Sequence, residues 1–340
     1  KLDTTSEHAK ARATRHMIEK FHGKPNPKAV ERVWDHLGSE DYHIRYAARI
    51  AMEWQDPKSW AKKAYSEKND IAAIHGLLGL ARCDFKGSAK PSIDRLLQIE
   101  FKDLDRTGKL ALLRTYSVIM SRSGMPSPDQ VEALGEQLDP YFPANDDNLN
   151  EELCRVLCYL DHPSVVRKTV ALMKTTKAKI PDYDVSIMKR HAGYGGKILS
   201  TMKEDVTPNV LNIHFLFCLK DVRSGWTMDY RKSYLGELQT LMTKKGGNMF
   251  TGYIQKIRES AIAAVPEKDR ISLQYLMGEV KSVDLSKLPK AQGPGVAWTV
   301  DSALDTLNKE PLLGRSYING KKMFSAGLCV ACHRFGDEGG

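Results

Sequence analysis

Residues 153–167, with the sequence LCRVLCYLDHPSVVR, indicate the fold class of this chain. Apolar side chains recur there every three or four residues, at Leu153, Val156, Leu157 and Leu160. This spacing places them on one face of a helix. The segment from Asp161 to Ser164 interrupts the pattern, and its proline lies where a new helix tolerates one. The stretch therefore predicts two amphipathic helices joined by a tight turn.

The same pattern extends from about residue 27 to residue 280, with little strand signal. Helical spacing of apolar residues occurs in segments 30–37, 44–52, 71–81, 93–99, 110–119, 131–138, 149–160 and 165–173. Prolines lie near several expected helix starts, at Pro57, Pro91, Pro128, Pro163 and Pro208. Short helices joined by tight turns are typical of stacked helix pairs. We therefore expect an all-α fold, an α-solenoid of antiparallel helix pairs.

Two turns share an order of residue types. Asp41 precedes Ile44 and Arg45, and Asp161 precedes Val165, Val166 and Arg167. This order resembles the HEAT repeat, whose turn aspartate and second-helix arginine support stacking between neighbouring repeats. The alternative is a pair of amphipathic helices with ordinary N-caps. Because the period is irregular, we expect residues 1–287 to form a HEAT-like array rather than a regular one.

Four cysteines lie within the helical pattern: Cys83, Cys154, Cys158 and Cys218. Cys154 and Cys158 are one helical turn apart, which raises the alternatives of a metal site or a disulfide. Unpaired cysteine is among the most buried residue types. We therefore expect core thiols, and a disulfide stays open because the protein is expected to be exported.

Near the C-terminus the chain reads Cys329-Val-Ala-Cys332-His333. Two cysteines separated by two residues and followed by histidine are the attachment signature of a c-type haem. Each thiol can add to one vinyl group, and the adjacent histidine can then bind the iron. The motif predicts covalent haem c, with Cys329 and Cys332 as thioether attachments and His333 as the iron ligand.

Two other chemistries use a similar motif. A zinc site normally needs two further ligands in a second cluster, and no other CxxC or HxxxH occurs. A thioredoxin-like pair belongs in a βαβ setting, which the sequence lacks.

The residues from Gly320 to Phe324 resemble the first helix of a class I cytochrome c. A helical glycine costs about 0.5–1 kcal/mol relative to alanine, so Gly320 suggests a close helix crossing.

Few residues follow the motif. A complete small cytochrome needs further helices, and usually a methionine as second axial ligand, and neither follows His333. Met323 precedes the motif, where helix packing is its expected role. We therefore expect residues 311–340 to be the N-terminal portion of a cytochrome c domain that continues beyond Gly340. Residues 288–310 predict a linker with a bridging helix at 298–307, and Pro311 is expected to open the next helix.

The second half has glycine-rich motifs. The run from His191 to Gly196 lacks the spacing of a phosphate-binding loop, so a bend between helices is expected. Together with Gly225-Trp226-Thr227, the Gly246-Gly247 turn and the CxxCH motif, this run resembles the haem-binding proteins of planctomycetes and verrucomicrobia. Their helical region precedes a c-type cytochrome, and many carry an upstream propeller resembling sugar dehydrogenases. The resemblance implies haem at Cys329, Cys332 and His333, and covers most of residues 30–340.

Composition limits the class of partner. The chain has 340 residues, 41% of them hydrophobic, and a formal net charge of +9. Its basic residues are spread along helices without an arm or a nucleic-acid motif, so solvated helix faces are expected and nucleic-acid binding is not. The functional alternative is attraction of an acidic redox partner. No apolar run approaches the ~18 residues of a membrane span.

Haem attachment predicts export to the periplasm or a similar compartment, and we infer that a leader precedes Lys1. The expected function is electron transfer, in which the solenoid positions the cytochrome for a redox partner or a fused dehydrogenase domain. The alternatives are a docking scaffold without redox activity and an enzyme with an open iron position. No triad, carboxylate pair or metal cluster supports an enzyme in residues 1–310. The acidic pairs Asp146-Asp147 and Asp103/Asp105 are expected to be turn residues and caps. The oligomeric state is not predicted.

Overall fold

The computed structural model describes residues 6–178, 207–244, 249–278, 290, 295–309, 314–329 and 333. All regular structure in these ranges is helical, which confirms the all-α prediction, and no strand occurs in them. The chain divides into two compact units. The first contains Lys1–Lys177 and Asn209–Tyr234, and the second contains Ala178–Pro208 and Leu235–Gly340.

The first unit is built from helices of five to eighteen residues. They are α1 (Glu7–Glu19), α2 (Ala29–Val33), α3 (Tyr42–Glu53), α4 (Ala61–Ser66), α5 (Asp70–Arg82), α6 (Ala89–Leu96), α7 (Arg106–Ser123), α8 (Pro128–Leu138), α9 (Asp147–Tyr159), α10 (Val165–Thr175), α13 (Val210–Leu219) and the start of α14 (Met228–Leu241). Four 3-10 turns connect them: η1 (Trp34–Gly38), η2 (Pro57–Ser59), η3 (Phe101–Asp103) and η4 (Asp139–Tyr141).

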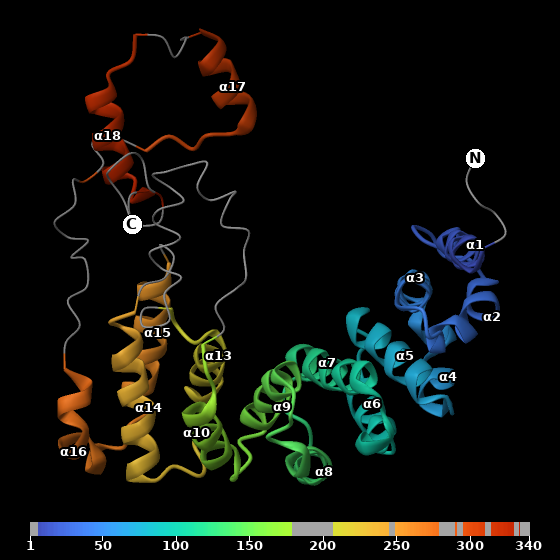
Figure 1. The fold of residues 1–340 in the computed structure, drawn as a ribbon. Helices are drawn as coiled ribbons and strands as arrows, with labels where there is room; N and C mark the ends of the chain where they lie inside the picture. Colours follow the sequence, from blue (N-terminus) through green and yellow to red (C-terminus); the bar gives the residue numbers. More distant parts are fainter. Residues whose placement is uncertain are drawn as a thin grey trace. The chain divides into compact units, whose positions relative to one another are not determined.

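Every second helix of this unit belongs to one continuous row. Helices α1, α3, α5, α7, α9 and α13 each contact the next member of that series. The intervening elements pack against this row: η1 contacts α3 and α5, α6 contacts α5 and α7, and α10 contacts α9 and α13 (Figure 1). Successive helix pairs therefore stack on each other along the sequence.

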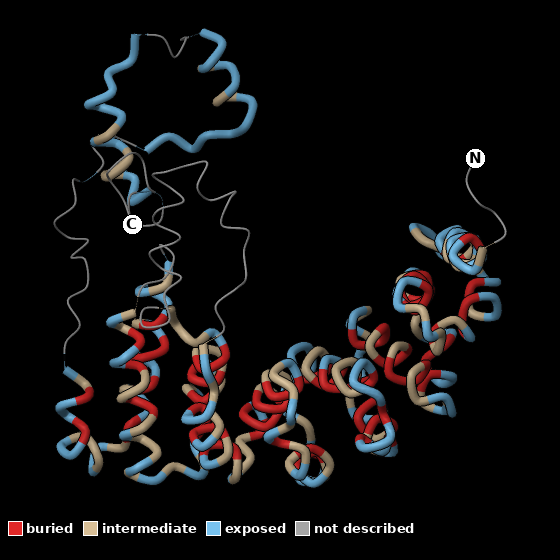
Figure 2. Tube along the Cα trace, in the orientation of Figure 1, coloured by how far each residue is buried: buried red, intermediate tan, exposed pale blue. Residues whose placement is uncertain are grey.

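Large apolar side chains fill the space between the two sets of helices. Trp34 and Trp60 meet edge to face, with ring centroids 6.2 Å apart. The Trp34 indole Nε1 donates a hydrogen bond of 2.6 Å to Glu67. Figure 2 shows the buried positions following the inner sides of the helices. Each fully buried large side chain contributes about 1.5–3 kcal/mol through removal of apolar surface from water, so this packing holds the stacked pairs together.

Polar residues at helix starts explain why the helices begin where they do. Asn69 accepts a hydrogen bond from the backbone of Ala72 and caps α5. Asp105 caps α7 and Asp146 caps α9 in the same way, as expected from the sequence. Each cap contributes about 0.5–2 kcal/mol, because the first amides of a helix have no carbonyl partner within it.

The two acidic turns that resemble each other in sequence differ in structure. Asp41 caps its own helix, accepting hydrogen bonds from the amides of His43 and Ile44 at 2.7 and 3.1 Å. Asp161 instead binds the turn between α13 and α14, accepting bonds from Arg223 and Ser224. The turn aspartate therefore links neighbouring helix pairs at only one of these two places.

The arginines of the two turns also differ. Arg45 is buried, and its Nη1 donates to the carbonyl oxygens of Ser39 and Glu40. Arg167 is exposed. Arg45 thus binds the turn preceding its own helix, and neither arginine forms an ion pair within the described part of the chain.

The cysteines of the first unit are free thiols, and Cys154 and Cys158 are buried as expected. The Sγ atoms of Cys154 and Cys158 lie 3.7 Å apart on α9, well beyond the length of a disulfide. Burial raises the pKa of Cys154 well above its usual value. It also raises the pKa of the half-buried Cys83 to about 11, with the nearby Glu53 as a further cause. These thiols are therefore poor nucleophiles at neutral pH.

The second unit contains the rest of α14, α15 (Phe250–Ala263), α16 (Glu267–Met277), α17 (Val300–Lys309) and α18 (Tyr317–Ala326). Ile254 and Ile257 of α15 and Leu273 of α16 are buried. The buried guanidinium of Arg258 donates to the carbonyl oxygens of Leu276 and Gly278, at 3.0 and 2.6 Å. This contact fixes the end of α16 against α15.

The predicted bridging helix is confirmed as α17, with Asp301 in its first turn. Thr299 and Ser302 cap it reciprocally, because each side-chain oxygen accepts the other's backbone amide, at 2.9 and 3.1 Å. Several predicted features lie outside the described residues: the bend at 191–196, the Gly246-Gly247 turn, the linker residues 291–294 and Pro311. The predicted boundaries at residues 287 and 310 stay predictions.

Candidate functional site

The helix that precedes the CxxCH motif is α18. It begins after Ser316, whose Oγ accepts the backbone amide of Asn319 at 3.3 Å. The helix that leads to the motif therefore begins at Tyr317, and Pro311, expected to open it, lies outside the described residues. The helix ends at Ala326, and Gly327 then donates its amide to the Met323 carbonyl at 2.8 Å. The motif follows this C-cap directly.

A single backbone hydrogen bond joins the two described residues of the motif. The amide of His333 donates to the carbonyl of Cys329 at 2.8 Å. Both Cys329 and His333 are exposed, and the Cys329 thiol lies 3.7 Å from the Gly327 carbonyl oxygen. Cys332 lies outside the described residues.

Several apolar side chains of α18 and of the residue pair that follows it are exposed. Tyr317 is 63% exposed and Ile318 66%, and Met323 and Leu328 are about half exposed. No residue of α17 or α18 is buried. Such a concentration of exposed apolar side chains usually marks a binding surface. In the sequence these exposed residues precede Cys329 and His333.

Gly320 was expected to permit a close helix crossing. A Cβ at this position would have no neighbouring atom within 4 Å in the described part of the chain. The glycine therefore leaves open space on α18, and Met323, expected to pack, is exposed.

Within the described ranges, clusters of metal-binding side chains are absent. There, no three His, Cys, Asp or Glu side chains are arranged to hold a metal ion. No helix among the same residues is both long and apolar enough to cross a bilayer.

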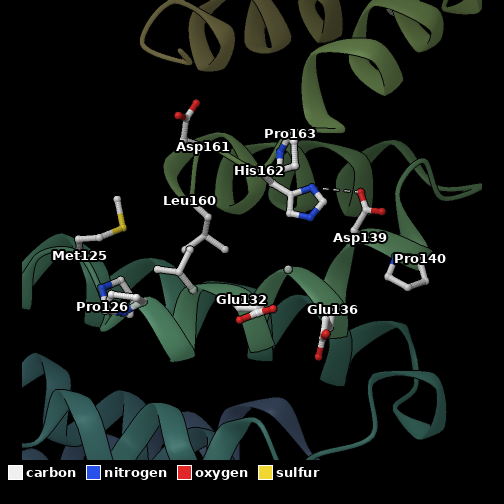
Figure 3. Close-up of a pocket in the computed structure, with 13 residues that line it drawn as sticks. Met125, Pro126, Glu132, Glu136, Asp139, Pro140, Leu160, Asp161, His162 and Pro163 are labelled. Atoms are coloured by element: carbon white, nitrogen blue, oxygen red, sulfur yellow. Dashed lines mark ion pairs between the residues drawn. The ribbon is translucent and has the colours of Figure 1, made fainter. Parts of the chain in front are cut away.

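In the first unit, a groove of about 740 Å³ lies between α8 and the turn from α9 to α10. Figure 3 shows His162 above α8, facing Asp139. A Cβ on Gly135 would lie only 2.8 Å from the His162 ring, so the glycine permits this close approach. Met125, Leu160 and several prolines complete the wall.

His162, Ser164 and Asp139 form a polar cluster beside the groove. The His162 Nδ1 lies 3.1 Å from the Ser164 Oγ and 3.5 Å from the Asp139 carboxylate. Burial raises the pKa of Asp139, but bonds from Lys168 and Ser164 lower it more, so the net shift is downward. Because serine and aspartate meet the same imidazole nitrogen, the histidine cannot relay a proton between them as in a triad. The cluster is a structural network.

Sequence reasoning identified the C-terminal motif because its spacing is local, but it missed this groove. Its walls come from three segments, around residues 125–126, 128–140 and 160–163. Comparison of the chain with protein-family models, with curated proteins and with solved structures found no match. The candidate site therefore rests on its own residues and geometry.

Proposed function

We propose that the chain is a c-type haem-binding electron-transfer protein. The observation that carries the proposal is the CxxCH motif, in which Cys329 and His333 are exposed and joined by a backbone hydrogen bond. In this proposal Cys329 and Cys332 hold the haem covalently and His333 binds its iron. When bound, haem supplies one-electron redox chemistry at the iron. The exposed apolar residues of α18 would shield part of the ring from water.

The first unit is proposed to act as a HEAT-like solenoid that positions this cytochrome portion. Its alternating helix rows support the proposal, as does the link between Asp161 and the turn after α13. Two residues differ from the HEAT pattern: Asp41 caps only its own helix, and Arg167 is exposed. A redox partner or a fused dehydrogenase domain would supply the electron. The protein is proposed to be exported, because covalent haem attachment takes place outside the cytoplasm.

The second candidate is a docking scaffold without redox activity. It is favoured by the first unit, which has its own buried core and a groove wide enough for part of a partner. In this case the CxxCH residues would carry no haem. The two candidates differ in one measurable property, the covalent cofactor.

The test is to export the chain from cells that contain the c-type cytochrome maturation machinery. We expect a pyridine haemochrome spectrum and an intact mass increased by one haem. The double variant Cys329→Ser/Cys332→Ser should lose both signals. The control Cys83→Ser, which removes a half-buried thiol outside the motif, should keep them. A folded chain without haem would overturn the electron-transfer proposal and favour the docking scaffold. Haem retained in the double variant would refute the assignment of Cys329 and Cys332 as the attachment residues.

A further inference from the structure

A second cavity lies between α3, α5 and the start of α7, separate from the groove beside His162. Its volume is about 360 Å³. Arg45 of α3, His75 of α5 and Thr107 of α7 line it, together with the turn from Gly38 to Glu40. Ligand sites in proteins are typically about 300–1,000 Å³, and one water occupies about 30 Å³. The cavity is therefore large enough for a small molecule.

Arg45 brings a buried positive charge to this cavity. It is 7% exposed, and its Nη1 donates to two backbone carbonyl oxygens, those of Ser39 at 2.6 Å and Glu40 at 2.8 Å. Its Nε is buried and has no hydrogen-bond partner in the described structure. Buried charges are as a rule paired, because an unpaired one loses its hydration without compensation.

Other buried arginines of the first unit show the contrast. Arg49 pairs with Glu53, and Arg95 pairs with Asp70 at 2.8 Å. Within the described residues Arg45 has no carboxylate within ion-pair distance. Its charge is therefore the one among these three that lacks a counter-ion.

His75 adds a second nitrogen without a partner. Its Nδ1 is buried and makes no hydrogen bond in the described part of the chain. Burial, together with the charges of Arg45 and Arg49, lowers the pKa of His75 to about 4. The charged groups that act on this imidazole are thus positive. An anion near it would meet an attractive field.

The two carboxylates on the cavity wall do not cancel this field. Asp105 Oδ1 accepts the amide of Gly108 at 2.7 Å and serves as the cap of α7. Glu40 is exposed, and its backbone oxygen, rather than its carboxylate, contacts Arg45. The N-terminus of α7 adds the positive end of a helix dipole on the same side, near Thr107.

We propose that this cavity binds a small oxyanion of the phosphate or carboxylate class between Arg45 and His75. The guanidinium supplies the charge and the unpartnered Nε–H, and the imidazole supplies a second polar contact. Planar guanidinium groups suit both kinds of oxyanion, because two N–H groups can donate in parallel. The site is independent of the haem motif and does not rest on the proposed electron transfer.

The experiment is a calorimetric titration of the whole chain with inorganic phosphate and, separately, with acetate, at constant ionic strength set with chloride. Histidine-labelled NMR follows the His75 resonances in parallel. We expect saturable binding of at least one oxyanion and an upward shift of the His75 pKa in its presence. Whichever anion binds more tightly identifies the class within the proposal.

Variants separate this site from general charge effects. Arg45→Met should weaken binding at least tenfold, and His75→Gln should weaken it less. The matched control is Arg167→Met, because Arg167 occupies the corresponding place after the second acidic turn but is exposed. Circular dichroism checks that each variant is folded, and His75→Gln serves as the test if Arg45→Met is not. Equal binding by the His75 and Arg167 variants, or no response of His75 in the wild type, would mean that the cavity holds only water.

Discussion

Replacing Asp161 by alanine should destabilise the link between the turn after α9 and the turn after α13. The carboxylate accepts three hydrogen bonds: from the Arg223 amide at 2.8 Å, the Ser224 amide at 2.9 Å and the Ser224 hydroxyl at 2.8 Å. Asp161 also has a φ of 52°, in the left-handed region. The alanine variant loses the carboxylate that accepts these bonds, and its side chain makes the left-handed backbone less favourable.

The expected loss can be worked out from these contacts. Hydrogen bonds to a charged group contribute about 1.5–3 kcal/mol each, but Asp161 is only half-buried, so the lower end applies. The three bonds are not additive, and about 3 kcal/mol is a reasonable total on that basis. The left-handed backbone adds about 1 kcal/mol for alanine. Asp161→Ala should therefore lower the free energy of unfolding by about 4 kcal/mol.

Matched variants separate the two contributions. Asp161→Gly removes the carboxylate without the backbone penalty, and so should cost about 3 kcal/mol from the hydrogen bonds alone. Asp161→Asn keeps one acceptor oxygen and tolerates the left-handed region, so it should cost less than either. Asp41→Ala is the control, because Asp41 only caps its own helix and should cost about 1 kcal/mol.

The assay is urea unfolding followed by circular dichroism, together with hydrogen exchange of the Arg223 and Ser224 amides. In Asp161→Ala these two amides should exchange faster, whereas Asp41→Ala should leave them protected. The reasoning is refuted if the Asp41 and Asp161 variants lose equal stability and both amides stay protected in each.

Two further outcomes are expected. His75 is neutral in the fold because its pKa is lowered to about 4, while the unfolded chain takes up the proton near pH 6.5. Stability should therefore fall by about 1.4 kcal/mol per pH unit between pH 6.5 and 4, about 3 kcal/mol in all, and His75→Gln should lose this part of the acid sensitivity in pH-dependent urea unfolding. Gly225 has a φ of 77°, and a Cβ there would lie 2.4 Å from the Pro163 carbonyl oxygen, so Gly225→Ala should lower the midpoint of thermal unfolding by an amount that corresponds to about 2 kcal/mol or more. An unchanged pH profile or midpoint, respectively, would contradict these expectations.

Part of the candidate site could be predicted because it depends on residues that are close together in the sequence. The spacing of Cys329 and His333 follows directly from the motif, and a backbone hydrogen bond joins them in the structure. The caps at Asp105 and Asp146 follow from residue type and position before an apolar run. The start of α18 depends on Ser316, because this residue offers a side-chain cap there.

The sequence by itself determined that this chain is helical, where many of its helices lie and which residues could attach a haem. Periodicity, capping and motif spacing depend on neighbours within one or two turns, so they can be read without a structure. Only the tertiary structure decided that Asp161 joins two turns while Asp41 does not. It also decided that Arg45 and His75 face one cavity with Thr107. Stacking of successive helix pairs brings these residues together, and the pattern of a single helix does not record how its neighbours pack.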